Sequence, residues 1–167
     1  MADAVMSYHR FYDFRIDGDV VGYFEIEATP SSIYQRARFV VDDSIVDNRY
    51  HLRLEDGSVT GFSTGDDAIW TSLDTYASEA YPLSSFPLLL DRLDGELTYL
   101  PIDESTGEVG PRRVLQREGA TVIERRDGRM TRSFTVQEGI LTSIDWGGAT
   151  SVLQPDRERA VARGPFE

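Results

Sequence analysis

Three polar side chains fall on strand faces that are otherwise apolar. They are Arg10, Gln35 and Arg132; the last, for example, alternates with Met130 and Phe134. An arginine inside a β-layer is costly unless it is paired or solvated. A water-accessible cavity holding an acidic or carbonyl ligand would remove that cost through charge-assisted hydrogen bonds. A buried ion pair, or a side chain that reaches solvent at a rim, would remove it equally well, so all three interpretations stay open.

Amphipathic aromatic residues occupy similar faces. Tyr12, Tyr50 and Tyr99 fall on apolar strand faces, and Trp146 ends the face that runs from Ile140 to Ile144. Tyrosine and tryptophan commonly line small-molecule pockets, but they also fill ordinary cores. These four residues, with Arg10, Gln35 and Arg132, form the candidate ligand-binding set.

The remaining titratable residues predict neither a metal site nor a catalytic triad. His9 and His51 fall on polar strand faces, apart from any evident nucleophile. The acids Asp42, Asp43 and Asp47 crowd one loop without the spacing of a calcium loop. We therefore expect solvated side chains at these positions and no cofactor, and catalytic residues stay unassigned.

Composition narrows the classes of function. The 167 residues carry 17 basic and 29 acidic side chains, for a net charge of −12 and no cysteine. Nucleic-acid binding needs a positive footprint, which this chain lacks. Every basic residue is arginine, so lysine-based covalent chemistry is excluded. Residues 1–7 do not resemble a signal peptide and no apolar run is long enough to span a bilayer, so we expect a cytoplasmic location.

Alternation and turn signals predict an all-β domain over residues 1–154, followed by a polar tail over 155–167. Short strands recur from Tyr8 to Ser63 and from Glu96 to Leu153, about ten in all, and Asp-Gly pairs mark several hairpins. The fourth strand is expected to begin at Arg49, after a loop that starts at Asp42. Between the two series lies a crossover with a short helix near Ser85 to Leu93. The expected architecture is a curled antiparallel sheet, either a half-barrel or a barrel.

This rhythm of strands and turns resembles bacterial β half-barrel and calycin-like proteins that hold lipids or other apolar ligands. The resemblance covers most of the chain and includes no diagnostic motif, so it assigns no residue. It implies a curled sheet with an apolar groove. Many such proteins are exported, and the absence of a leader is a departure from that pattern.

Three functions remain as hypotheses. The leading one is binding of a small, largely apolar molecule, similar to a lipid, polyketide or terpenoid, in the concave face. In this hypothesis Arg10 and Arg132 would bond to its acid or carbonyl group. The first alternative is a cofactor-independent isomerase or cyclase that uses the same pocket. The second is a structural protein that forms a homodimer through a sheet edge.

Overall fold

The computed structural model describes residues 7–55, 58–64, 71–72, 90, 93–101 and 110–161. Twelve strands form a single sheet in which every neighbouring pair is antiparallel, which confirms the all-β prediction. The strands are β1 (Tyr8–Ile16), β2 (Asp19–Thr29), β3 (Ser32–Val41), β4 (Ser44–Glu55), β5 (Ser58–Thr64), β6 (Thr71–Ser72), β7 (Glu96–Tyr99), β8 (Arg113–Glu118), β9 (Thr121–Arg126), β10 (Arg129–Gln137), β11 (Ile140–Asp145) and β12 (Ala149–Gln154).

The strand order is β6-β5-β4-β3-β2-β1-β12-β11-β10-β9-β8-β7. Each strand therefore pairs with its neighbour in sequence, except that the first strand pairs with the last. We call β1–β6 the N-terminal arm and β7–β12 the C-terminal arm. Within the described residues, the pairing of β1 with β12 is the one backbone connection between the two arms of the sheet.

Tight hairpins explain this regular order. Asp17 and Gly18 both have positive φ, at 50° and 88°, as a two-residue turn of the primed type requires. Asp42 and Asp43 do the same, with φ of 50° and 60°. This second turn was not predicted, and it lets β4 begin at Ser44, where the sequence suggested a loop up to Arg49. Aspartate tolerates the left-handed region better than most residues, so two in succession can replace Asp-Gly.

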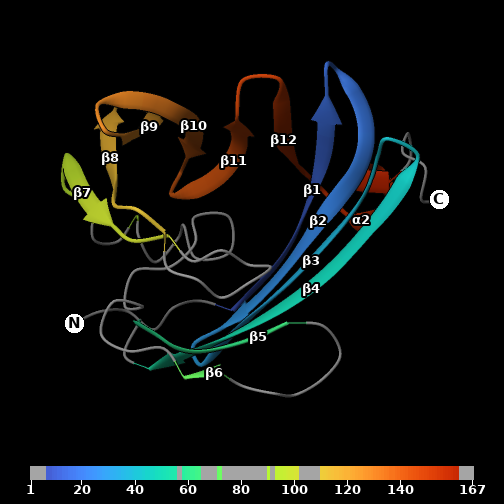
Figure 1. Ribbon diagram of the computed structural model, residues 1–167, viewed down its shortest axis with the longest axis horizontal. Helices are drawn as coiled ribbons and strands as arrows, with labels where there is room; N and C mark the ends of the chain where they lie inside the picture. Colours follow the sequence, from blue (N-terminus) through green and yellow to red (C-terminus); the bar gives the residue numbers. More distant parts are fainter. Residues whose placement is uncertain are drawn as a thin grey trace.

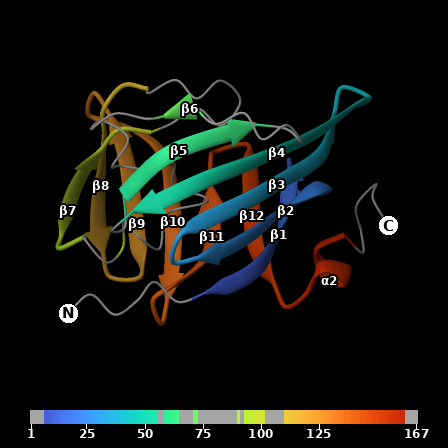
Figure 2. The same ribbon diagram turned by 90° about the horizontal axis from the view of Figure 1, so that it is seen from below.

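The sheet is curved, and its two arms face one another (Figure 1). In a view rotated by 90° about the horizontal axis, the strands of the N-terminal arm cross in front of those of the C-terminal arm (Figure 2). A single core lies on the concave side: Phe24 and Leu52 from one arm belong to the same buried cluster as Leu115 and Phe134 from the other. Across the bend, the Tyr12 hydroxyl donates to the carbonyl oxygen of Leu141 at 2.8 Å.

A short helix covers part of the convex face. Helix α2 (Arg157–Val161) buries Ala160 and Val161 against Tyr23 of β2. It forms within the segment predicted to be a polar tail. The helix predicted near Ser85 to Leu93 lies largely outside the described residues. None of the helical structure that is described is long and apolar enough to cross a bilayer.

A buried carboxylate holds the seam between β1 and β12 together. Asp13 is 2 % exposed and lies on the convex side, where the backbone pairing of the two strands skips from Tyr12 to Arg15. Its Oδ1 accepts the backbone N–H of Val152 at 3.0 Å, and its Oδ2 accepts the Gln154 amide at 3.0 Å. Arg15 donates to the same Oδ2 from Nε at 3.0 Å and Nη2 at 2.7 Å. The Asp13 side chain thus replaces a backbone acceptor where the β1–β12 pairing is interrupted.

We expect Asp13→Ala to lower the free energy of unfolding by about 3 kcal/mol, because it leaves a buried N–H of β12 without an acceptor. Urea unfolding followed by circular dichroism measures this loss. Asp19→Ala, at an exposed carboxylate at the start of β2, is the matched control and should change stability by less than about 0.5 kcal/mol. Equal effects of the two substitutions would contradict the role assigned to Asp13.

Candidate functional site

A hollow of about 490 Å³ opens where β1 continues past the end of β12. The last paired residues are Phe11 and Gln154. Pro155 then leads the chain away toward α2, because proline has no N–H with which to continue the ladder. The start of β1 therefore runs on without its neighbour. The residues that line the hollow are His9, Arg10, Phe11, Leu153, Gln154, Pro155 and Asp156.

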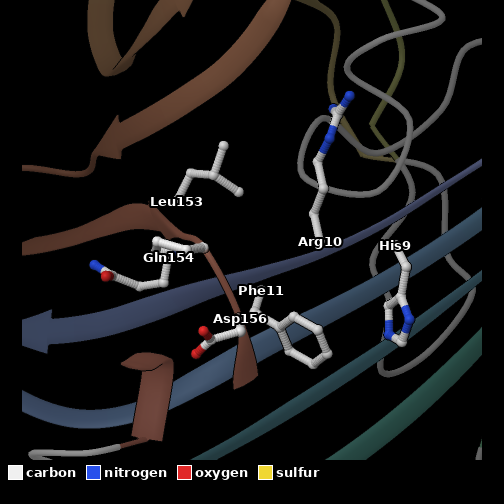
Figure 3. A pocket seen from close by; sticks show the side chains of 7 residues that line it. His9, Arg10, Phe11, Leu153, Gln154 and Asp156 are labelled. Carbon is white, nitrogen blue, oxygen red and sulfur yellow. The ribbon is translucent and has the colours of Figure 1, made fainter. Parts of the chain in front are cut away.

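The lining comes from both faces of the sheet. Figure 3 shows Arg10 and Leu153 pointing to one side of β1, and His9, Phe11 and Asp156 pointing to the other. The side of Arg10 and Leu153 is the concave one, since Leu153 packs against the main core and is paired with Tyr12. The side chain of Asp156 is engaged elsewhere: its Oδ1 accepts the backbone N–H of Arg159 at 2.8 Å and caps α2. The guanidinium of Arg10 is therefore the cation that reaches the hollow from the concave side.

Four of the seven candidate residues lie on the concave face of β1 to β4, and Arg10 is the one of them that lines the hollow. Strand register places Arg10 next to Ile26, Ile26 next to Gln35, and Gln35 next to Tyr50, in one row across β1 to β4. Tyr12 lies two residues beyond Arg10 on the same face. Gln35 is 1 % exposed, so a polar amide lies fully inside this row. The structure thus joins a cation, an amide and two tyrosines from three different strands.

The guanidinium of Arg10 packs over an aromatic ring, with Cζ 4.0 Å from the centroid of Tyr8. Burial raises the pKa of Tyr12 to about 12, and the charge of Arg10 opposes that rise. Burial likewise raises the pKa of Tyr8, again against the influence of Arg10. Both phenols therefore stay neutral at physiological pH and can donate hydrogen bonds. Among the described residues, no carboxylate forms an ion pair with Arg10.

Two further candidates lie together in the C-terminal arm, around a carboxylate that the sequence reasoning missed. Glu124 of β9 is 0 % exposed. Its Oε1 accepts Arg132 Nε at 2.9 Å, the Thr131 hydroxyl at 2.8 Å and Arg113 Nη1 at 3.3 Å, and its Oε2 accepts the hydroxyl of Tyr99. We call Tyr99, Arg113, Glu124, Thr131 and Arg132 the Glu124 cluster. Of the interpretations left open for Arg132, the structure places it in a buried ion pair.

Tyr99 completes this cluster. Arg132 Nη2 lies 3.5 Å from its hydroxyl oxygen. Burial raises the pKa of Tyr99 well above its usual range; Arg132 opposes the rise and Glu124 adds to it. The phenol therefore remains protonated and serves as a donor.

The seventh candidate, Trp146, lies apart from both groups. Its ring packs near Phe14 and Phe24, with centroids 5.9 Å and 6.3 Å away. It is a half-buried aromatic residue at the edge of the main core. The structure therefore divides the seven candidates into four on the concave face of β1 to β4, a pair within the Glu124 cluster, and this single tryptophan.

Two strand faces assumed from the sequence are wrong, both because of bulges. In β11 the pairing with β10 shifts at Thr142, so Leu141 rather than Ile140 shares the buried face with Ile144. The other error is in β10. Met130 was placed on the same face as Arg132, but Met130 is 65 % exposed while Arg132 is 7 % exposed. A bulge at Thr131 shifts the register of β10 against β9, so that Arg132 becomes the cross-strand partner of Glu124. The alternation of Val122 with Glu124 was the available signal for this carboxylate. Nothing in the sequence marked the hollow residues Gln154 and Asp156.

Comparison with protein-family models, with curated proteins and with solved structures finds no match for this chain. The described residues also contain no group of three or more histidine, aspartate or glutamate side chains that could hold a metal ion.

Glu124→Gln removes the charge that pairs with the buried Arg132 and the partly buried Arg113. We expect a loss of about 3–5 kcal/mol in the free energy of unfolding, as for other buried pairs that lose one partner. Chemical denaturation measures it. Glu118→Gln, at an exposed position near the end of β8, should be nearly neutral. A Glu124→Gln protein as stable as that control would show that the cluster is not held by its charges.

Because of its tyrosines, we expect the folded protein to lose stability at high pH. The chain has no lysine and no cysteine, so tyrosine is the main side chain that titrates between about pH 9 and 12. The folded pKa of Tyr12 is raised to about 12. Its contribution to stability is therefore complete below pH 10 and is lost as the pH rises through about 12.

Tyr12→Phe should lose about 1 kcal/mol at pH 8, because the bond to Leu141 is gone, and it should weaken less than wild type on going to pH 12. Urea unfolding at a series of pH values between about 8 and 12 measures both effects. Stability curves that stay parallel across this range would contradict the predicted shift of Tyr12.

Proposed function

We propose that this protein binds a small amphiphilic molecule, with the acid or carbonyl group of the ligand at Arg10 and its hydrocarbon part along the concave face. The observation that carries the proposal is the hollow, because it brings a cation to an opening beside the main core. Its volume of about 490 Å³ falls within the roughly 300–1,000 Å³ of typical small-molecule sites.

The surroundings of Arg10 suit such a ligand. Leu153 offers apolar surface on the same side of the hollow as Arg10. A ligand carboxylate at Arg10 would accept charge-assisted hydrogen bonds in a partly desolvated place, where they are stronger than in water.

An enzyme of the isomerase or cyclase kind is the second candidate, and one observation favours it. Tyr99 is an inward-facing phenol with a raised pKa beside Arg132, as hydrogen-bond catalysis on a carbonyl substrate would use. Its hydroxyl, however, already donates to Glu124. A substrate oxygen would have to compete with that carboxylate, so we place binding ahead of catalysis.

Dimerisation through a sheet edge remains a weaker proposal. The outermost strands, β6 and β7, span two and four residues. Such short edges offer few free backbone groups to a partner, which is one way proteins avoid edge pairing. Native mass spectrometry of the purified protein would show a dimer directly, and it would also show any small molecule that is released on unfolding.

The binding proposal predicts that a dansyl-labelled fatty acid binds the wild-type protein and that Arg10→Ala weakens this binding by about 10- to 100-fold, the loss expected for hydrogen bonds to a charged group. Fluorescence titration measures both dissociation constants. The methyl ester of the same probe, which has no charge, should bind wild type and variant nearly alike.

Arg129→Ala is the matched control, since Arg129 is an exposed arginine at the first position of β10. It should leave the affinity unchanged. An Arg10→Ala protein that binds the acid as tightly as wild type would refute the assigned role of Arg10. Absence of binding to wild type, together with a native mass free of any small molecule, would overturn the proposed function.

A further inference from the structure

Arg113 of β8 carries a buried donor without an acceptor. Within the described part of the chain, its Nε is shielded from solvent and has no hydrogen-bond partner. Buried polar groups are nearly always paired, so an unpaired guanidinium N–H calls for a physical explanation. The Glu124 cluster, to which Arg113 belongs, is the place to seek it.

The charge of Arg113 is the less well compensated of the two in that cluster. Its Nη1 reaches Glu124 Oε1 at 3.3 Å, whereas Arg132 Nε reaches the same oxygen at 2.9 Å. The hydroxyl of Thr131 occupies that oxygen as well, at 2.8 Å. One carboxylate oxygen therefore serves three donors, and Arg113 holds the longest of the three bonds. An added acceptor beside Arg113 would satisfy its Nε and balance its charge.

Access to this point comes along Arg113 itself. The side chain of Glu124 is 0 % exposed and that of Arg132 is 8 % exposed, but that of Arg113 is 19 % exposed. Arg113 is also paired across the strands with Tyr99, so its Cα lies beside the buried phenol. Part of the Arg113 side chain thus meets solvent, and a small anion that binds there would reach Nε by displacing the atoms that shield it.

We propose that Arg113 forms a second subsite, specific for an oxyanion, at the solvent side of the Glu124 cluster. The forked N–H groups of arginine match the two oxygens of a carboxylate or the oxygens of a phosphate. The ligand class is therefore a small carboxylate or phosphate, either free or at the end of an apolar chain. The subsite goes beyond the proposed role of Arg10 and does not depend on it.

The test uses three anions as probes: acetate, inorganic phosphate and decanoate, each compared with chloride at equal ionic strength to remove general screening. On wild-type protein, NMR follows the Nε–H resonance of Arg113, assigned by its absence in Arg113→Lys. At least one probe should shift this resonance in a saturable way. A shift with acetate or phosphate identifies a free anion, and a shift with decanoate alone identifies the head group of an amphiphile.

Thermal unfolding provides the second readout. The rise in Tm that the effective probe gives to wild type should disappear in Arg113→Gln and in Arg113→Lys, with apparent affinity reduced by roughly tenfold or more. The comparison is made between each variant with and without the probe, so a lower starting Tm does not obscure it. Arg117→Gln is the control, because Arg117 is an exposed arginine on the same strand and side, and it should keep the full rise.

The subsite is overturned if no probe moves the Arg113 resonance of wild type, or if the anion-dependent rise in Tm is the same in Arg113→Gln as in wild type. These outcomes are separate from those of the Arg10 proposal. Acetate and phosphate have no apolar chain, so they test Arg113 even if no amphiphile binds. Conversely, a fatty acid that depends on Arg10 and not on Arg113 supports the proposed function alone.

Discussion

The pairing of the first strand with the last determines the architecture of this protein. The other pairings join strands that follow one another through the chain, so each arm forms from local contacts that close at little entropic cost. The β1–β12 seam instead joins residues more than a hundred positions apart, such as Asp13 and Val152. The arms can share one core only if this seam holds. A charged acceptor at the seam is therefore well placed, since charge-assisted bonds are stronger than neutral ones.

The same seam explains why a hollow lies where it does. β12 ends at Gln154 because Pro155 cannot continue the ladder and because Asp156 begins a helix on the convex face. β1 starts three residues before its pairing with β12 begins, at Tyr8. An opening at this end therefore follows from two local rules, the chemistry of proline and the capping of α2. The exposure of Arg10 on the concave side is a consequence of that geometry.

Much of the fold could be predicted from the sequence. The wrong predictions concern which face a side chain lies on, and bulges caused them. Alternation correctly indicated an all-β sheet, and Asp-Gly pairs marked turns such as Asp17-Gly18. Bulges broke the inference of faces: the extra residue at Thr131 exposes Met130 and brings Arg132 opposite Glu124. A bulge leaves no mark in residue types, yet it moves every later side chain to the other face. Predicting that Arg10, Gln35 and Tyr50 lie in one row requires the order of the strands in the sheet, and the alternation of residue types does not reveal that order.

The two polar sites differ in a way that bears on function. At the Glu124 cluster, the cost of burying Arg132 is offset by a carboxylate of the protein itself, so that this charge is largely structural. At Arg10 the described residues supply aromatic rings instead of a carboxylate, and a ring compensates a cation only partly. In the proposed binding function, a cation that no carboxylate of the described residues pairs with is the better candidate to bind an anionic ligand. This contrast between the two arginines favours Arg10 over Arg132 as the residue that would recognise an acid group, although both were equal candidates in the sequence.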